Sequence, residues 1–222
     1  MVDGVRRHHQ VRAGRAAALA VHRQPPDRRR HVLTGVVRWR SDEHGYGLVT
    51  RVLHWTTVVL VVAQFALGWA LTRADDLLEP LADARFGGEE DALVVVHVGI
   101  GITILVLAVL RLGWRLATSL PPWAEGLSSR ERRVSHVVEV VLYTCLFLVP
   151  VTGLGLFLLS GEDWALGAGR EFVGPLELLD DDTWLAAHVA TQLVFLATLA
   201  VHVGMALHHQ FVRRDGLVSR ML

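Results

Sequence analysis

The sequence contains a single cysteine, Cys145, and no lysine among its 22 basic residues. One cysteine excludes an internal disulfide, a thiolate zinc cluster, an iron–sulfur cluster held by this chain alone, and any group attached through a C-x-x-C-H motif. Cys145 lies in an apolar run, where we expect a small buried hydrophobic side chain. The formal net charge is zero, so the chain also lacks the overall positive field of a nucleic-acid-binding protein.

Several familiar catalytic motifs are absent from the sequence. It has no G-x-x-x-x-G-K-[ST] nucleotide loop, no G-x-S-x-G nucleophile turn and no H-E-x-x-H metalloprotease motif. Soluble enzyme chemistry of these kinds is therefore not expected.

Long apolar runs are what the chain has in abundance. Hydrophobic residues make up 52% of it, and a helix of about 20 apolar residues crosses the hydrocarbon core of a membrane. Four stretches approach that length, at residues 52–71, 92–110, 137–159 and 184–207. The third contains Pro150, Gly153 and Gly155, which membrane helices tolerate where neighbouring helices satisfy the freed backbone groups, so we expect a kinked span. The sequence predicts an all-α integral membrane protein built as a four-helix bundle.

The arginines and the acidic residues are segregated along the chain. Eleven arginines occur up to and including Arg51, five lie between the second and third spans, and three follow the fourth. Loops 72–91 and 160–183 carry only three arginines but fourteen of the 22 acidic residues. Positive residues in short flanking segments stay on the cytoplasmic side. We therefore expect a multi-pass protein of the inner (plasma) membrane with both termini in the cytoplasm.

Residues 1–45 differ in character from the rest of the chain. They are rich in arginine and histidine and show no apolar periodicity, and the apolar run at 16–21 is too short for a secretory signal. We expect a disordered cytoplasmic tail that could touch anionic lipid. A misassigned start codon explains the same composition equally well. Residues 46–222 are then the transmembrane domain.

Four of the twelve histidines lie within the predicted spans, where an ionisable side chain indicates function. His54 is near the cytoplasmic start of the first span, and His97 is near the outer start of the second. His188 and His202 are fourteen residues apart in the fourth, which is about 21 Å along a helix and within about 40° of the same face. Depth therefore pairs His97 with His188, and His54 with His202. Each pair could hold one haem iron from both sides, which leaves no open position for oxygen.

The histidine pattern leaves alternatives open. A single intramembrane histidine can serve only to bond a neighbouring helix, although two depth-matched pairs are harder to explain in that way. His136, at the cytoplasmic mouth of the third span, could replace His54 as a ligand. His208 and His209 are expected at the membrane interface.

Glycines and arginines near these histidines suggest further contacts. Gly99 and Gly101 could leave room for a flat macrocycle, or could serve ordinary helix packing. Five arginines could bind haem propionates or extend only to lipid headgroups: Arg51, Arg111 and Arg115 on the inner side, and Arg85 or Arg170 outside.

From about Tyr46 to Leu222, the chain resembles the prokaryotic cytochrome b561 family in the order and spacing of short motifs. These are Arg51-Val52-Leu53-His54-Trp55, His97-Val98-Gly99-Ile100-Gly101, Arg111-Leu112-Gly113-Trp114-Arg115-Leu116, Pro121-Pro122, and the C-terminal His202, His209, Phe211, Arg214-Asp215-Gly216 and Met221-Leu222. The resemblance implies a four-helix bundle with two b haems, ligated by histidines of spans one, two and four. It also implies electron exchange with ubiquinone or menaquinone, and some members have been assigned the oxidation of superoxide at the outer face.

The chain departs from the family pattern at Glu139. A histidine commonly stands there, ahead of the tyrosine equivalent to Tyr143. Glu139 could handle protons near a quinone, or it could be an interfacial acid paired with an arginine.

The sequence therefore predicts a transmembrane b-type cytochrome that passes electrons through two bis-histidine haems to or from the quinone pool. Whether it turns over as an enzyme or only relays electrons stays open. One alternative is the membrane haem subunit of a hydrogenase or dehydrogenase complex, whose electron donor would be a partner redox protein. Another is a haem-free membrane scaffold or transporter, which would be colourless and would leave the paired histidines unexplained.

Overall fold

Four long helices dominate the computed structural model, which describes residues 38–42, 45–73, 91–119, 121–123, 127–165 and 171–221. They are α2 (Leu48–Arg73), α4 (Asp91–Ala117), α5 (Ser129–Leu159) and α6 (Asp181–Leu207). Each helix is long and apolar enough to cross a membrane. The four predicted spans are thus confirmed as helices of spanning length.

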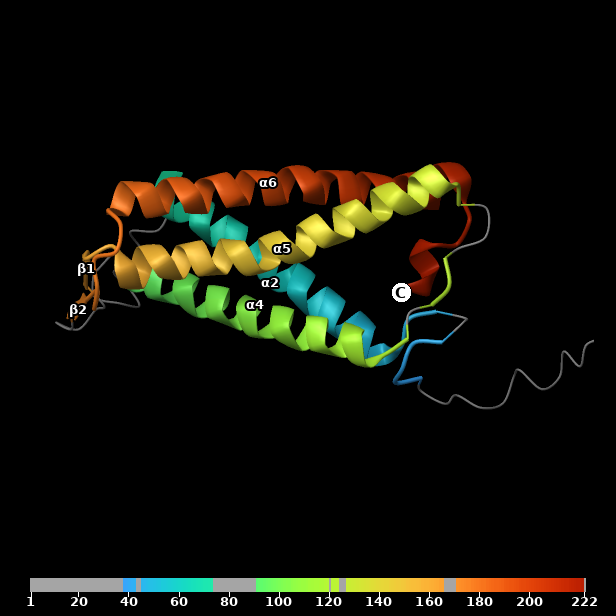
Figure 1. Cartoon of the computed structure of the whole chain (residues 1–222), viewed down its shortest axis with the longest axis horizontal. Coiled ribbons are helices and arrows are strands. Elements are labelled where there is room, and N and C mark those ends of the chain that lie inside the picture. The colour runs from blue at the N-terminus through green and yellow to red at the C-terminus, as the bar shows by residue number, and fades with distance from the viewer. Residues whose placement is uncertain are drawn as a thin grey trace, which may run out of the picture. The chain divides into compact units, whose positions relative to one another are not determined.

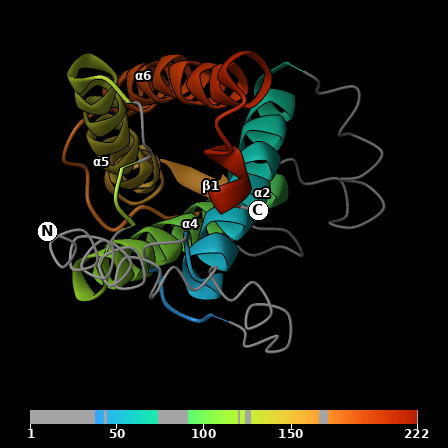
Figure 2. The same ribbon diagram turned by 90° about the vertical axis from the view of Figure 1, so that its right-hand side faces the viewer.

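The helices alternate in direction. In Figure 1, α4, α5 and α6 run along the long axis and α2 crosses them obliquely. Helices α2 and α5 begin at the end where α4 and α6 finish. The packed pairs are α5 with α6, α2 with α4, and α4 with α5, and the view along the axis in Figure 2 shows the four helices around a common centre.

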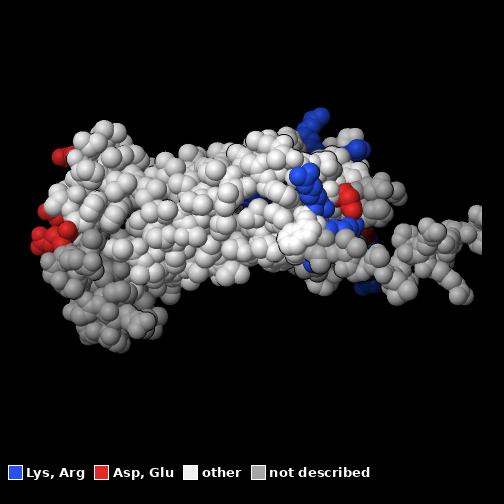
Figure 3. Space-filling model, turned by 90° about the horizontal axis from the view of Figure 1, so that it is seen from below, with Lys and Arg blue, Asp and Glu red and all other residues white. Residues whose placement is uncertain are grey.

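The two ends of the bundle differ in charge. We call the end at which α2 and α5 begin the basic end, and the opposite one the acidic end. Figure 3 shows arginines gathered at the first and carboxylates at the second. Seven exposed acidic residues mark the acidic end: Glu162, Asp163, Glu171, Glu177, Asp180, Asp181 and Asp182.

Side-chain caps explain where α5 and α6 begin. Ser128 and Glu131 form a reciprocal capping box at the start of α5, which satisfies two backbone N–H groups that have no partner within the helix. The Asp180 carboxylate accepts a hydrogen bond of 2.8 Å from the Thr183 backbone N–H at the start of α6. That contact holds the pKa of Asp180 below its ordinary value. Helix α5 continues through Pro150.

A short hairpin lies at the acidic end. Strands β1 (Asp163–Ala165) and β2 (Glu171–Val173) pair antiparallel. The Phe172 ring stacks on Phe157 of α5 with centroids 5.0 Å apart, and Trp164 lies 5.4 Å from the same ring. The aromatic contacts hold the hairpin against the end of α5.

The C-terminal segment turns back toward the start of α2. Two short helices follow α6, namely η1, a π-helix (His208–Arg213), and η2, a 3-10 helix (Val218–Arg220). Arg214 (φ 53°) and Gly216 (φ 72°) adopt left-handed conformations between them, which reverses the chain. Trp55 Nε1 then donates to the Met221 carbonyl at 3.1 Å, and Figure 2 shows the C-terminal end beside α2.

Most of the tail predicted for residues 1–45 lies outside the described residues. Of its last part, Arg38 and Asp42 form an ion pair of 2.9 Å, and the Leu48 N–H donates to the Arg38 carbonyl at 2.8 Å. Residues 38–222 form one compact unit.

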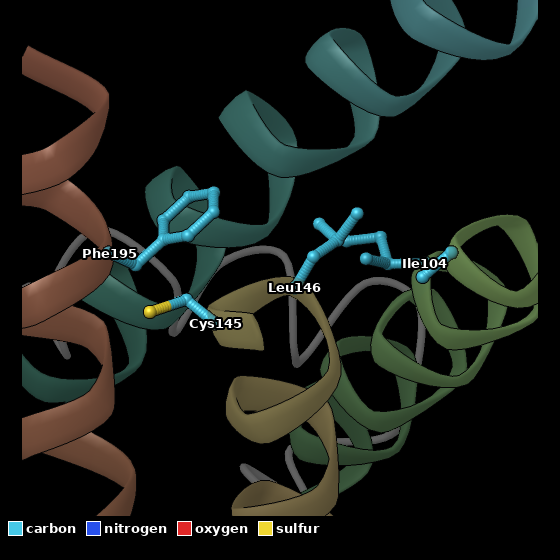
Figure 4. Packing of buried hydrophobic residues seen from close by; sticks show 5 residues of the cluster. Ile104, Cys145, Leu146 and Phe195 are labelled. Carbon is cyan, nitrogen blue, oxygen red and sulfur yellow. The ribbon is translucent and has the colours of Figure 1, made fainter. Parts of the chain in front are cut away.

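The apolar core lies between the helices near their midpoints. Its buried members include Ile104, Cys145, Leu146 and Phe195, which Figure 4 shows close together. Phe65 stacks on Phe195 with centroids 5.8 Å apart. Cys145 is 4% exposed, which confirms the small buried hydrophobic side chain expected from the sequence.

Candidate functional site

The structure brings the four intramembrane histidines together as two pairs. His97 of α4 lies beside His188 of α6, with ring centroids 6.4 Å apart. His54 of α2 lies beside His202 of α6, with centroids 6.5 Å apart. These are the pairs that depth in the sequence predicts, one toward each end of the bundle.

Each pair belongs to a level to which all four helices contribute. A spacing of fourteen residues joins His54 to Gly68 in α2, His97 to Arg111 in α4, Glu139 to Gly153 in α5, and His188 to His202 in α6. Fourteen residues advance a helix by about 21 Å and return to within about 40° of the same face. We call His54, Arg111, Glu139 and His202 the basic-end level, and Gly68, His97, Gly153 and His188 the acidic-end level.

An apolar layer separates the two levels. Seven residues from each level, the four helices place Val61, Ile104, Leu146 and Phe195. Ile104, Leu146 and Phe195 are buried and Val61 packs against them. The two histidine pairs are therefore separated by tightly packed apolar side chains.

Two glycines let the histidines of the acidic-end level approach the neighbouring backbone. A Cβ atom added at Gly68 would lie 3.0 Å from Cε1 of His97, and one at Gly153 would lie 2.9 Å from Cε1 of His188. Both distances are below ordinary van der Waals contact, so a side chain at either position would displace the imidazole. The predicted glycines behave differently: Gly99 faces open space and Gly101 faces Gln64.

Thr152 orients the imidazole of His188. Its Oγ1 lies 3.1 Å from Nδ1 of His188, and its hydroxyl donates to the Leu148 carbonyl at 2.8 Å. With that hydrogen engaged, Oγ1 can accept a hydrogen bond from Nδ1–H of His188. In that tautomer, Nε2 of His188 is unprotonated and available to a metal.

His97 has a different set of neighbours. Gln64 Nε2 donates to the His97 backbone carbonyl at 2.9 Å. Within the described part of the chain, Nδ1 of His97 and Oε1 of Gln64 are both buried without a hydrogen-bond partner. Nδ1–H of a metal-bound imidazole normally finds an acceptor, and Gln64 offers one on the facing helix.

Charged side chains distinguish the basic-end level. Arg111 Nη2 lies 3.0 Å from Nδ1 of His54, and its guanidinium lies 5.5 Å from the centre of the Tyr143 ring. Arg115 binds both carboxylate oxygens of Glu139, at 2.8 and 3.1 Å. Glu139 is therefore paired with an arginine, which is one of the two roles predicted for it. Arg111, in contrast, forms no ion pair with a carboxylate of the described residues.

Tyr46 lies at the mouth of the basic end, just before α2. Burial, aided by the Glu139 carboxylate, raises the pKa of Tyr46 above its ordinary value. Its hydroxyl therefore stays protonated at neutral pH and can donate a hydrogen bond.

The remaining predicted residues fall outside the two pairs. His136, the alternative to His54 as a ligand, is exposed on α5. The imidazole beside His202 is that of His54. His208 is exposed at the end of α6. His209 is 5% exposed, because the chain reversal after η1 brings Asp215 Oδ2 to 2.6 Å from its Nδ1. Arg85 and Arg170 lie outside the described residues.

The two pairs fit haem ligation from both sides of the iron. Two imidazoles on opposite sides of one metal ion, each about 2 Å from it, have ring centroids about 6 Å apart, and the observed separations are 6.4 and 6.5 Å. No cluster of three or more histidine, cysteine, aspartate or glutamate side chains able to hold a metal occurs among the described residues. Two protein ligands suffice for haem, since the porphyrin supplies the other four.

Comparison with known proteins gives consistent matches. The sequence profile of a family described as "Prokaryotic cytochrome b561" matches residues 45–222. The chain is 26% identical over 191 residues to cytochrome b561 homolog 2 of Escherichia coli (strain K12), an alignment that covers 80% of this chain and 90% of that protein. Cytochrome b562 of Cereibacter sphaeroides is 26% identical over 182 residues (82% and 98%). The protein named "Probable superoxide oxidase CybB" of Yersinia pestis is 24% identical over 171 residues (77% and 91%).

Proposed function

The chain belongs to the prokaryotic cytochrome b561 family, and on that premise we propose that it carries electrons through two bis-histidine b haems to the quinone pool. Family membership brings a b-type haem and a multi-pass membrane location. The observation that carries the two-haem proposal is the presence of two imidazole pairs, 6.4 and 6.5 Å between centroids, in separate levels.

The bound haem supplies one-electron redox chemistry at each level. The residues of the chain hold it and shield it from water. Each histidine pair would hold one haem iron from both sides, which would leave oxygen no open ligand site. The apolar layer of Val61, Ile104, Leu146 and Phe195 keeps water and ions out of the path between the levels.

Charge supports a direction for the electron. Arg111 lies 3.0 Å from His54 and has no carboxylate partner among the described residues. A nearby positive charge stabilises the reduced state of a redox centre. The histidines of the acidic-end level have Gly68, Gly153 and Thr152 beside them in place of an arginine. We therefore expect electrons to run from the acidic-end level to the basic-end level.

We place the basic end in the cytoplasm and the acidic end outside, in the inner membrane. The support is the segregation of arginines and carboxylates in Figure 3, together with the rule that positive flanking residues stay inside. Both termini then lie on the cytoplasmic side.

Polar groups at the basic end suit a quinone. Tyr46 keeps its proton, and the Arg115–Glu139 pair lies on the same side of the bundle. A quinone that takes electrons must also take protons. A tyrosine hydroxyl can donate a hydrogen bond to a quinone carbonyl, and a nearby carboxylate can accept one from a quinol hydroxyl.

One relative is named a probable superoxide oxidase, and superoxide is a candidate donor at the acidic end. The seven exposed carboxylates there repel an anion. If superoxide is the donor, its rate of oxidation should rise with ionic strength as this repulsion is screened. A neutral donor would show no such dependence, and a cationic redox protein would show the opposite one.

The deciding experiment is the haem-to-protein ratio of the detergent-purified full chain, together with a redox titration. We expect two b haems per chain and two components in the titration, with both reduced centres reoxidised by added ubiquinone or menaquinone in proteoliposomes. One haem per chain would contradict the paired arrangement, and a colourless protein made under ample haem supply would overturn the proposal.

A further inference from the structure

An apolar groove near the middle of α5 and a pair of arginines at its start lie along the same outward face of this helix. We propose that together they bind one anionic phospholipid of the surrounding leaflet. Its phosphate lies at Arg130 and Arg133, and one acyl chain lies in the groove between α5 and α6. The site lies on the outer face of α5 and α6, uses none of the four histidines, and does not depend on the proposed electron transfer.

The groove is lined almost entirely by apolar atoms, which suits a hydrocarbon chain. It has a volume of about 300 Å³ and is lined by Val141, Thr144, Leu148, Ala190 and Val194, among others. The Thr144 hydroxyl donates to the carbonyl of Val140 in its own helix at 2.9 Å, so that hydrogen is not offered to the groove. Val141 lies about 160° around the helix from Glu139, so the groove opens away from the basic-end level.

A continuous stripe connects the groove to Arg130. Arg130, Val134, Val137, Val141, Thr144 and Leu148 follow one another at spacings of four and three residues, which places them on one helix face. Val134, Val137 and Leu148 are 42, 54 and 43% exposed. The stripe is therefore a lipid-facing surface once α5 spans a membrane.

The length of the stripe matches one leaflet. Fourteen residues separate Arg130 from Thr144, which corresponds to about 21 Å along the helix. Half of a bilayer, from headgroup to midplane, measures about 20–22 Å. A phospholipid whose phosphate lies at Arg130 thus ends its acyl chain at the level of the groove.

The arginines are placed for an anion. Arg130 and Arg133 are exposed and make no hydrogen bond or ion pair with another described residue. Glu131, the acidic residue between them, already binds Ser128 and Arg213. Arg130 and Arg133 also lie in the first two turns of α5, where the helix dipole disfavours cations and favours anions. Basic sites between membrane helices on the cytoplasmic side are known to bind anionic headgroups.

The chain provides its own matched control in Arg132. It is exposed and basic like its neighbours, but it lies nine residues before Val141 and so about 180° around the helix from it. Arg132→Gln therefore removes the same charge from the wrong face, whereas Arg130→Gln with Arg133→Gln removes the proposed phosphate site. Ala190→Leu fills the groove without changing charge.

The test measures binding of phosphatidylglycerol to the purified full chain in detergent, against phosphatidylcholine with the same acyl chains. We expect the wild type and Arg132→Gln to bind phosphatidylglycerol alike. The double variant should bind about 30-fold more weakly, since each arginine near an anionic lipid contributes about fivefold. Ala190→Leu should weaken binding as well, and haem content reports whether each variant has folded.

Several results would overturn the inference. Equal binding of phosphatidylcholine would remove the role of charge, and an equal loss in Arg132→Gln would show only a diffuse attraction of the basic end. Competition by inorganic phosphate alone at millimolar concentration would indicate an anion site without a lipid chain. Undiminished binding in Ala190→Leu, or a stable dimer that covers the groove, would exclude the acyl chain from it.

Discussion

Thr152 Oγ1 of α5 lies 3.1 Å from Nδ1 of His188 in α6, at the level where α5 also contributes Gly153. The threonine offers Nδ1–H of the imidazole an acceptor, and the glycine lets the ring approach the α5 backbone. Two adjacent residues of α5 therefore contact the ring of one candidate ligand.

Replacing Thr152 by valine keeps the shape of the side chain and removes the acceptor. We expect the haem of the acidic-end level to be held about 10-fold to 100-fold more weakly, as for other losses of a partner behind a metal-bound histidine. The rate of haem transfer to an excess of apomyoglobin measures this. Thr152→Ser keeps the hydroxyl and should behave as the wild type. An unchanged transfer rate in Thr152→Val would show that the contact has no part in ligation.

Removing single histidines tests the two pairs. His97→Ala or His188→Ala should remove the haem of the acidic-end level, and His54→Ala or His202→Ala that of the basic-end level, because one imidazole cannot complete the axial pair. Each variant should retain about one haem per chain by extraction. His136→Ala is the control and should keep two. Retention of two haems in His202→Ala would contradict the pairing at the basic end.

Glycine replacements test the close approach at the acidic-end level. Gly153→Ala places a Cβ 2.9 Å from Cε1 of His188, so the imidazole must move, although alanine ordinarily favours a helix by about 1 kcal/mol. We expect thermal stability of the apoprotein to hold or rise while the spectrum of one haem shifts or is lost. Gly99→Ala, where a Cβ meets nothing within 4 Å, should leave both haem spectra unchanged. Equal spectra in all three proteins would show that the approach at Gly153 is unimportant.

Much of this arrangement could be predicted from the sequence. The lengths of the apolar runs indicate four spanning helices, and the depths of His54, His97, His188 and His202 suffice to pair them. Gly68 and Gly153 were missed, although the fourteen-residue spacing between His188 and His202 recurs from His54 to Gly68. The spacing alone does not reveal that a glycine contacts a histidine, because that histidine lies on a neighbouring helix whose packing must first be known.

Other features depend on tertiary contacts that no local pattern encodes. The burial of His209 requires the π-helical turn and the left-handed Arg214, which bring Asp215 back to it. The contact at Nδ1 of His188 requires α5 to pack with Thr152 facing it. Both residues are unremarkable in the sequence, since threonine is common in membrane helices and an aspartate near a helix end usually faces water.

Arg111 should set the potential of the basic-end haem. Arg111→Gln removes a positive charge from beside His54, and we expect the midpoint potential of that haem to fall by an amount on the order of 50–100 mV. The acidic-end haem, about 21 Å away along the helix axes, is the internal control and should shift little. Arg111→Lys keeps the charge and should restore most of the potential. A potentiometric titration that shows no change in Arg111→Gln would remove the support for the proposed direction of electron flow.

The contact between Asp215 and His209 should make the folding of the C-terminal segment, residues 208–221, depend on pH. The hydrogen bond to His209 holds the pKa of Asp215 below its ordinary value, so the carboxylate stabilises the folded segment above the unfolded pKa of about 3.9. That stabilisation is lost as the pH falls through the lower, folded value. Asp215→Asn should mimic the acid state at neutral pH, at a cost of about 1–2 kcal/mol to the local fold.

Amide hydrogen exchange along residues 208–221 measures this opening. In the wild type, we expect protection in this segment to fall below about pH 4, while α2 and α4 keep theirs. In Asp215→Asn, protection should already be low at neutral pH and should change little on acidification, because the titrating group is gone. Asp180→Ala, which removes a cap at the other end of the bundle, should leave the segment as it is in the wild type. If Asp215→Asn and the wild type lose protection at the same pH, another group controls the folding of this segment.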